Sequence, residues 1–240
     1  MDCIFPQRIQ KALNLPPIQN IFGALPKNPS KPPWEKRPAN TINEIVIHHS
    51  ASTGTLAAEA NYHINNRGWY TLSYHFSIDR GNIYQINDPL SITWHASGAN
   101  TNGIGICVNW DLRKRPLTQF ERDAVIGLVL VLKEMFPTIT KVSGHNEVGK
   151  RNGYATACPV ISMDKLREDI MTVENEIAYN ESPQKKEEIA FRLMNQMTYF
   201  YNLSRGKNPD GTPATEGNKA WGLNMILSME TEFRKRGFLK

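Results

Sequence analysis

Histidine and cysteine are the residue types best suited to chemistry in this chain, and they gather in its middle. All six histidines lie between positions 48 and 145, and Cys158 follows His145 by 13 residues. His48 and His49 directly follow the apolar run Ile45-Val46-Ile47. Two imidazoles and one thiolate suit zinc, and three protein ligands leave a fourth tetrahedral position open, as in catalytic sites. A histidine at a strand end is also commonly a hydrogen-bonded structural residue, so spacing alone leaves both interpretations open.

The elements that must position these residues alternate between strand and helix patterns. Apolar and β-branched runs predict strands at residues 44–49, 74–79, 83–86, 104–109 and 138–142. Apolar positions at helical spacing predict helices at 55–66, from Thr118 to before Pro137, and at 163–178. Thr118 and Glu121 have the spacing of a capping box. Interleaved strands and helices over residues 41–180 predict an α/β, or mixed α+β, layer fold.

The two ends of the chain differ from this middle region. Eight of the 15 prolines fall within residues 1–40, which predicts a proline-rich lead without regular helix or central strand over most of its length, draped or partly disordered. Residues 181–240 predict two further helices, at 185–203 and 221–236, and the first places Ile189, Leu193, Met197 and Phe200 on one side. This helical region either packs on the main domain or forms a separate module. Such a module would target a cell wall or bind a partner.

Composition limits the class of protein. In 240 residues, 40% are hydrophobic and 21% charged, which is typical of a globular chain, and no apolar stretch approaches the roughly 20 residues of a membrane helix. Residues 1–10 contain no apolar segment of a secretory signal, so we expect synthesis in a cytoplasm. Three cysteines cannot form a disulfide framework and favour thiols or a metal ligand.

The net charge of +5 belongs to the flanks. Residues 1–40 carry six basic and two acidic side chains, residues 41–180 carry 12 and 14, and residues 181–240 carry 10 and 7. These basic flanks are either ordinary solvated surface or regions that attract an anionic polymer such as nucleic acid or teichoic acid. No run of Lys and Arg exceeds three residues, so nucleic acid is not expected as a partner.

Five local sequences together resemble a known family. They are IVIHHSAS (45–52), GWYTLSYHFSIDRGNIYQ (68–85), WHASGANTNGIGICV (94–108), GHNEV (144–148) and ATACP (155–159). In this order they are similar to the zinc-dependent N-acetylmuramoyl-L-alanine amidases of the type 2 family, which includes bacteriophage amidase lysozymes and peptidoglycan recognition proteins. The resemblance covers about residues 41–170 and implies a central mixed β-sheet flanked by helices, with a zinc amidase domain at 41–180.

The resemblance also assigns roles to individual residues. It implies that His48, His145 and Cys158 hold the zinc, while His49 is a packing neighbour, and that Tyr74 is the active-site tyrosine. Phage members often carry a lysine two residues before the cysteine, where this chain has Thr156. A threonine there is also common among active recognition-protein amidases, and its hydroxyl can support an oxyanion without supplying charge.

Further residues are expected around the substrate. Tyr74 is one candidate for the proton donor to the leaving nitrogen, and His95 is an alternative. Asn102 and Gly103 are expected to line the groove for the muramyl group or the peptide. Where the enzymes that recycle anhydromuropeptides carry a glutamate after Ile-Gly-Ile, this chain has Cys107, as phage members do. His63 and His75 are expected to be structural.

The function implied is hydrolysis of the amide between N-acetylmuramic acid and L-alanine in bacterial peptidoglycan. Zinc would activate water and polarise the carbonyl. A phage or prophage endolysin, made in the host cytoplasm and acting on the wall after release, fits the missing signal segment. The alternatives are a peptidoglycan-binding protein without catalysis and a virion-associated lysin or tail component. Binding-only relatives commonly lose the cysteine ligand, which Cys158 supplies here. The sequence indicates no membrane partner and no oligomeric state.

Overall fold

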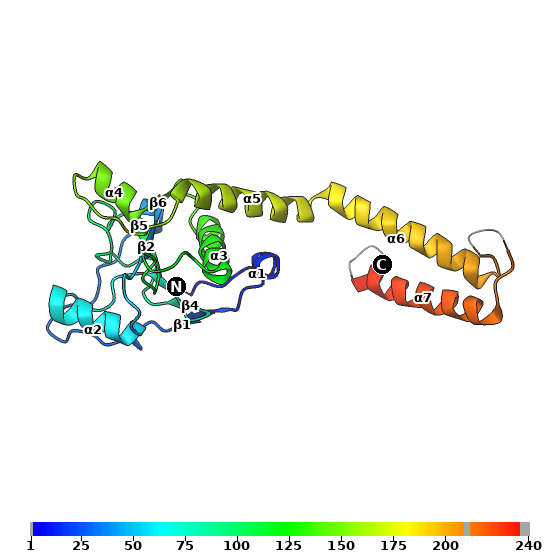
Figure 1. Ribbon diagram of the computed structural model, residues 1–240, viewed down its shortest axis with the longest axis horizontal. Coiled ribbons are helices and arrows are strands. Elements are labelled where there is room, and N and C mark those ends of the chain that lie inside the picture. The colour runs from blue at the N-terminus through cyan, green and yellow to red at the C-terminus, as the bar shows by residue number, and fades with distance from the viewer. Residues whose placement is uncertain (1, 209–211, 236–240) are drawn as a thin grey trace. The chain divides into compact units, whose positions relative to one another are not determined.

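The computed structural model describes residues 2–208 and 212–235, without the side chains at 186, 189–194, 196, 232, 233 and 235. The chain divides into two compact units, Met1–Ile177 and Ala178–Lys240 (Figure 1). None of the helices in the described part of the chain combines the length and apolar content that crossing a bilayer requires.

Unit 1 is built on one six-stranded mixed sheet, which confirms the predicted fold class. Its strands are β1 (Ile18–Asn20), β2 (Glu44–His49), β3 (Phe76–Asp79), β4 (Asn82–Gln85), β5 (Gly103–Val108) and β6 (Lys141–Gly144). Their order across the sheet is β1-β4-β3-β5-β2-β6. β3 and β4 pair antiparallel and form the predicted hairpin around Gly81, whereas the other pairs are parallel.

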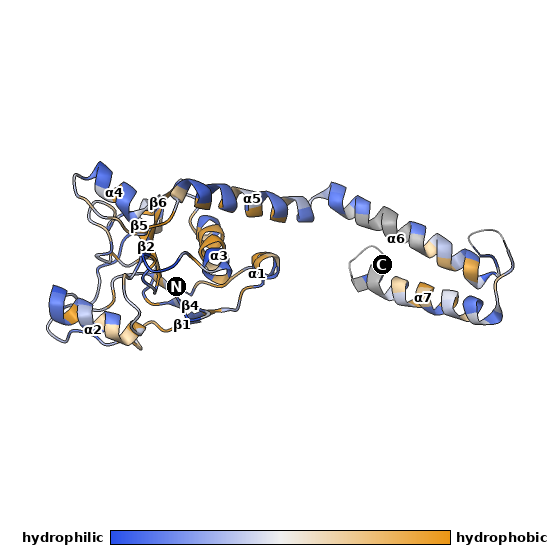
Figure 2. Ribbon diagram, in the orientation of Figure 1, coloured by the Kyte–Doolittle hydropathy of each residue, from blue (hydrophilic) through white to orange (hydrophobic). Residues whose placement is uncertain are grey.

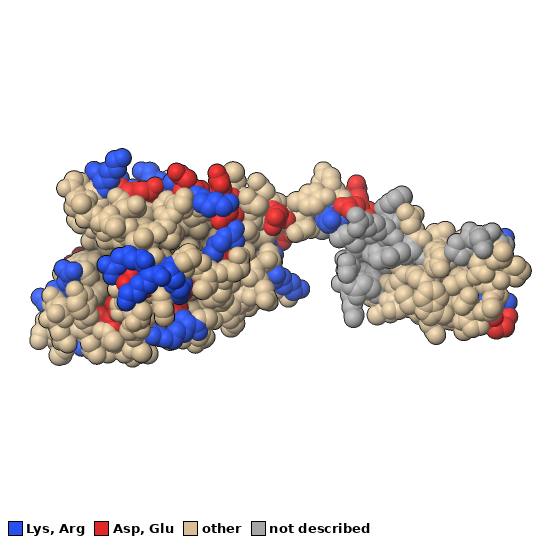
Figure 3. All heavy atoms as spheres, in the orientation of Figure 1, with Lys and Arg blue, Asp and Glu red and all other residues tan. Residues whose placement is uncertain are grey.

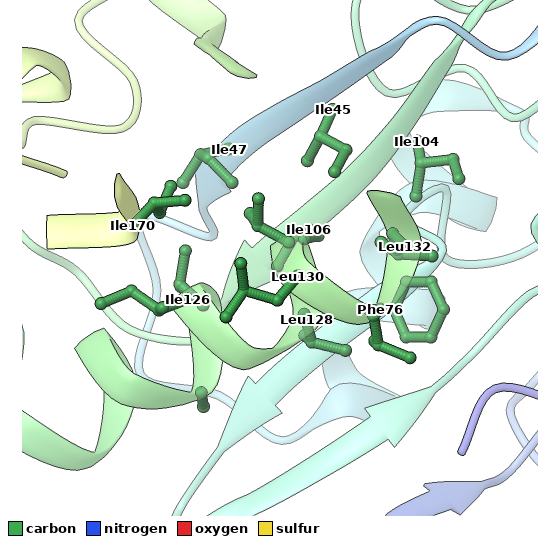
Figure 4. Close-up of a cluster of buried hydrophobic side chains, with 14 of the residues drawn as sticks. Ile45, Ile47, Phe76, Ile104, Ile106, Ile126, Leu128, Leu130, Leu132 and Ile170 are labelled. Carbon is green, nitrogen blue, oxygen red and sulfur yellow. The ribbon is translucent and has the colours of Figure 1, made fainter. Parts of the chain in front are cut away.

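The neighbouring strands β2 and β5 carry much of the core and lead to the candidate site. Every residue of β2 and of β5 is buried, as expected for parallel strands covered on both faces. In Figure 4, isoleucines of both strands meet the apolar side chains of α3 (Gln119–Met135). The capping box predicted from Thr118 and Glu121 is present at the start of α3. In Figure 2 this helix is mainly orange, in keeping with its run of buried residues.

The N-terminal residues differ from the expected draped or partly disordered lead. They form α1 (Gln7–Leu13) and β1, which extends the sheet by pairing with β4. Cys3, Phe5, Ile9 and Leu15 are buried in the main core. The prolines stand beside these elements and not inside them, because Pro6 precedes α1 and Pro16-Pro17 precede β1. Proline at such flanking positions is compatible with both helix and edge strand.

The remaining elements frame the site or form unit 2. Unit 1 also contains α2 (Leu56–Arg67), a 3-10 turn (Ala39–Thr41), α4 (His145–Arg151) and α5 (Met163–Glu181), which runs into unit 2. Unit 2 contains α6 (Pro183–Ser204) and α7 (Glu216–Lys235), which pack against each other. The side chains of Ile189 and Leu193, predicted to share a face of α6, and all of Arg236 lie outside the described residues.

One predicted strand is displaced. The chain was expected to be extended at residues 138–142, but β6 begins at Lys141 and ends at Gly144. Its partner β2 fixes this register, since Glu44 pairs with Lys141 and Ile47 with Gly144. Long-range pairing therefore overrides the local β-branched pattern of residues 138–142.

Candidate metal centre

The sheet register brings the predicted metal ligands together. His48 follows Ile47 in β2, and His145 follows Gly144 at the end of β6. Because Ile47 and Gly144 are paired in neighbouring parallel strands, the histidines that directly follow them lie side by side. Their rings lie with centroids 4.6 Å apart. Cys158 reaches the same point from the loop after α4.

The geometry of the three side chains fits a tetrahedral metal ion. Ligand atoms of His48, His145 and Cys158 all lie within 4.8 Å of one another. Cys158 Sγ is 3.8 Å from His48 Nδ1. In a zinc tetrahedron with Zn–N near 2.0 Å and Zn–S near 2.3 Å, the edge between nitrogen and sulfur is about 3.5 Å long. The donor set and its spacing therefore suit zinc, with one position left for another ligand.

A second histidine fixes which nitrogen of His48 faces this centre. His95 Nε2 lies 3.2 Å from the Gly103 carbonyl oxygen, and His95 Nδ1 lies 3.1 Å from His48 Nε2. A carbonyl only accepts, so His95 Nε2 carries the proton and its Nδ1 accepts from His48 Nε2–H. His48 Nδ1 then keeps its lone pair for a metal.

Burial keeps the imidazole rings of His48 and His95 neutral. Desolvation lowers the pKa of His95 to about 3, and it lowers the pKa of His48 well below the usual value, with smaller contributions from neighbouring histidines. A neutral imidazole is the form that binds metal. With Nε2 donating to Gly103 and Nδ1 accepting from His48, His95 has no proton free for a leaving group. The structure thus argues against His95 as the proton donor.

Glycines in β5 make room for His95. A Cβ atom on Gly105 would lie 2.8 Å from His95 Cγ, closer than real Cβ contacts, and one on Gly103 would lie 2.5 Å from the Ala99 carbonyl oxygen. These residues were not predicted to support the metal centre. A glycine inside an apolar strand is nevertheless a sign that another group approaches the backbone closely.

The loop around Cys158 is held by backbone hydrogen bonds. The His49 N–H donates to Cys158 Sγ (3.3 Å), and the Asn146 N–H donates to the Cys158 carbonyl oxygen (2.6 Å). Burial raises the pKa of the Cys158 thiol to about 12, and the His49 hydrogen bond acts against this shift. A metal cation would stabilise the thiolate at this position.

Tyr74 adjoins the cluster next to His48. It lies two residues before β3 begins, not within it as predicted, and its ring centroid is 5.1 Å from that of His48. Burial raises the pKa of Tyr74 well above its usual value, so the hydroxyl keeps its proton at neutral pH.

The other predicted site residues are placed as follows. Thr156 Oγ1 accepts from the Cys158 N–H (3.3 Å), and Thr156 lines an open hollow of about 720 Å³ together with Asn146 and Lys150. Gly103 pairs with Glu44, at the opposite end of the parallel strands from His48. Asn102 donates to Asn43 Oδ1 (2.7 Å). Asn102 and Gly103 therefore do not flank the metal cluster directly, and Gly103 reaches it only through His95.

The remaining histidines have structural partners. Nδ1 of His49 accepts from the Leu112 N–H, Nδ1 of His63 from the Ser73 N–H, and Nδ1 of His75 from the Gly105 N–H. These contacts agree with the packing roles expected for all three.

Comparison with known proteins identifies the class of this fold and site. A family model described as N-acetylmuramoyl-L-alanine amidase matches residues 38–160, which include the metal cluster and Tyr74. Peptidoglycan-recognition protein SC2 of Drosophila melanogaster is 30% identical over 131 residues, covering 50% of this chain and 70% of the relative. The endolysin of Enterobacteria phage T3 is 34% identical over 76 residues, covering 30% of this chain and 50% of the relative. This chain belongs to the N-acetylmuramoyl-L-alanine amidase family.

Solved structures agree at the level of the fold. The N-acetylmuramoyl-L-alanine amidase LysC from Clostridium intestinale URNW superposes with a TM-score of 0.52 at 23% identity, covering 65% of this chain and 97% of that one. The Ph2119 endolysin from a Thermus scotoductus bacteriophage gives a TM-score of 0.52 at 21% identity, covering 63% and 97%. The first 37 residues and all of unit 2 lie outside the residues that the family model matches.

Proposed function

We propose that this chain is a zinc-dependent peptidoglycan hydrolase that cleaves the amide between N-acetylmuramic acid and L-alanine. The observation that carries the proposal is the convergence of His48, His145 and Cys158 ligand atoms within 4.8 Å in a chain of this family. Bound there, zinc would lower the pKa of water and polarise the scissile carbonyl.

The surrounding side chains orient the reacting groups. Tyr74 keeps its proton and stands beside His48, so it can donate a hydrogen bond to the developing oxyanion or a proton to the leaving nitrogen. Thr156 supports the Cys158 loop through its side-chain oxygen and can donate its own hydrogen toward the substrate. His95 acts as a positioning residue that holds His48 in the tautomer required for metal binding. Asn102 and Gly103 remain predicted contributors to the groove.

The biological role that we propose is that of a phage or prophage endolysin acting on the cell wall. Similarity to the phage T3 endolysin supports it. A peptidoglycan-binding protein without catalysis is the alternative raised by the recognition-protein relatives. The presence of Cys158 favours catalysis over binding alone, because a thiolate completes the metal donor set.

Ligand variants test this proposal against the binding-only alternative. We expect Cys158→Ser and His145→Ala to lose both bound zinc and release of stem peptides from purified peptidoglycan. Cys3→Ser is the matched control, because Cys3 is a buried thiol far along the sequence from the cluster and should leave turnover intact. Normal turnover in either ligand variant would contradict the proposed mechanism.

A further inference from the structure

Three aromatic side chains enclose a hollow that the proposed chemistry does not use. Trp34, Tyr70 and Trp94 line a cavity of about 160 Å³, whose rim carries Lys31 and Glu35. Trp34 meets both other rings edge to face, with centroids 5.9 Å from Tyr70 and 5.6 Å from Trp94. We refer to these five residues as the aromatic hollow.

The walls of the aromatic hollow are fixed by backbone hydrogen bonds. The Asn28 N–H donates to the Tyr70 carbonyl oxygen, and the Ile92 N–H donates to the Glu35 carbonyl oxygen. The nitrogen–oxygen distance is 2.7 Å in both bonds. Below them the buried Arg37 guanidinium donates to two backbone carbonyl oxygens, those of Pro89 and Asn100. The N-terminal segment is therefore tied to both neighbouring loops, and the hollow is preformed.

A series of ring contacts connects the aromatic hollow with the metal centre. Trp94 directly precedes His95, whose ring is hydrogen-bonded to the metal-facing His48. A second connection runs through Trp69, whose ring centroid lies 6.1 Å from Trp94 and 4.9 Å from His63. His63 in turn adjoins Tyr74, with ring centroids 5.8 Å apart, and the Tyr74 ring lies 5.1 Å from that of His48.

We propose that the aromatic hollow binds a pyranose ring of the peptidoglycan glycan strand next to the scissile amide; this rests on the proposed function. The electron-rich faces of tryptophan and tyrosine attract the weakly positive C–H faces of a sugar ring. Lys31 and Glu35 add one donor and one acceptor at the rim, where sugar hydroxyl and acetamido groups need partners.

A stem peptide fits the aromatic hollow less well than a sugar. Peptide recognition by β-strand addition relies on free backbone groups along the site. Here the Tyr70 carbonyl, the Glu35 carbonyl and the Ile92 N–H are already paired within the protein. The rim charges also cancel, so the hollow offers no net positive charge to peptide carboxylates. In Figure 3 basic and acidic side chains are likewise interspersed on the visible face of unit 1.

Part of the aromatic hollow lies outside the residues that the family model matches. Lys31, Trp34 and Glu35 precede residue 38, where the matched region begins. The N-terminal segment therefore has a function in this interpretation: it supplies one wall of a sugar site beside a metal centre that the family region builds.

Direct binding of a peptide-free sugar tests the proposal on the full chain. The probe is the β-1,4-linked tetramer of N-acetylglucosamine, which lacks the scissile amide, so binding is measured by calorimetry without turnover. We expect the wild-type chain to bind it and Trp94→Ala to bind roughly tenfold more weakly, since a large aromatic contact is lost. Trp94→Phe should restore most of the affinity. Absence of tetramer binding by the wild-type chain would overturn the proposal without reference to any variant.

Matched controls separate the aromatic hollow from other causes. Trp221 lies in unit 2 and is 49% exposed, against 47% for Trp94, so Trp221→Ala removes an equally exposed indole elsewhere and should leave tetramer binding unchanged. A synthetic stem peptide should bind wild type and Trp94→Ala equally. If Trp94→Ala instead weakened peptide binding and spared the tetramer, the hollow would be a peptide site. Tetramer binding without any amide cleavage would refute the proposed hydrolase and leave the sugar site standing.

Discussion

The two units of the chain use their apolar residues in different ways. In unit 1, β2 and β5 are buried along their whole length, and the described histidines lie on or around that sheet. In unit 2, only a few described apolar side chains are buried, among them Leu203 and Met229. Large apolar side chains of unit 2 are exposed instead, namely Tyr199, Tyr201, Trp221, Leu223 and Leu227.

This difference distinguishes a unit with a packed candidate site from one with many exposed apolar side chains. A metal centre needs side chains held in one geometry by a packed surround, which the six-stranded sheet provides. Two helices enclose little core between them, and exposed apolar side chains such as those of α6 and α7 are of the kind that contact other parts of a chain or other molecules. Whether unit 2 packs on the amidase domain or targets the wall stays a prediction, and the experiments below address each side of the contrast.

Acid should destabilise unit 1 and spare unit 2. Burial lowers the pKa of His63 from 6.5 to about 4, so between these values the unfolded chain binds a proton that the folded chain does not. The free energy of unfolding therefore falls as the pH drops through this window, by roughly 2–3 kcal/mol at pH 4.5 from His63 alone. Unit 2 contains no histidine. Urea unfolding at pH 7 and 4.5 measures this loss of stability. Monitoring it by hydrogen exchange in peptides of each unit compares unit 1 with unit 2.

His63→Gln is the control for this acid effect. The variant keeps an acceptor for the Ser73 N–H but cannot titrate, so its unit 1 should lose correspondingly less stability on acidification. The lowered pKa of Asp169, about 2 beside Arg122, matters only at still lower pH. Equal stability of wild-type unit 1 at both pH values would show that His63 is not held neutral by burial.

Removing the partner of His48 should weaken the metal centre. We expect His95→Ala to lower zinc affinity about 10- to 100-fold, as loss of an outer hydrogen-bond partner of a ligand does. His95→Gln, which can still accept from His48 Nε2–H, should lose less. Competition with a chromophoric chelator measures affinity independently of turnover. Unchanged affinity in His95→Ala would mean that the ring does not position His48.

Two alanine substitutions in α7 should change unit 2 in opposite directions. A Cβ on Gly222 would lie 2.8 Å from the Phe200 carbonyl oxygen, so Gly222→Ala should destabilise the α6–α7 pair by about 2 kcal/mol. Gly217 has open space around it, and Gly217→Ala should stabilise the helix by less than about 1 kcal/mol. Urea unfolding of unit 2 measures both. Any change in hydrolysis of soluble substrate by either variant would break the proposed division between the units.

Ending the chain after Asn180 should have the smallest effect on chemistry. Because no proposed site residue lies beyond Cys158, we expect unchanged hydrolysis of soluble muropeptides. Cosedimentation with whole cell walls should decrease if unit 2 targets the wall. Undiminished wall binding would exclude targeting and favour the helical pair that packs on the main domain.

The sequence predicted the three side chains of the candidate metal centre better than it predicted their surroundings. His48, His145 and Cys158 stand in short motifs that local sequence displays directly, and the structure brings all three together. The contact between His95 and His48 joins residues 47 positions apart and depends on the space above Gly105, so no local pattern contains it. Such contacts arise only when strand pairing brings distant segments of the chain together.

The N-terminal segment also shows that local sequence patterns do not predict long-range contacts, in this case contacts of the fold. Its prolines correctly indicated an irregular path, but local patterns gave no sign that β1 would pair with β4, more than 60 residues away. Trp34 was not predicted as a functional residue, because its significance depends on Tyr70 and Trp94 in two separate loops. The displaced start of β6 likewise follows from its register with β2.

The bond that the protein cuts is the central claim, and mass analysis of the fragments released from purified peptidoglycan tests it most directly. Our account predicts stem peptides with free L-alanine amino termini alongside glycan strands of undiminished length, and no such products with Cys158→Ser. New reducing sugar ends, cleavage within the stem peptide, or no release by the zinc-loaded protein would contradict it.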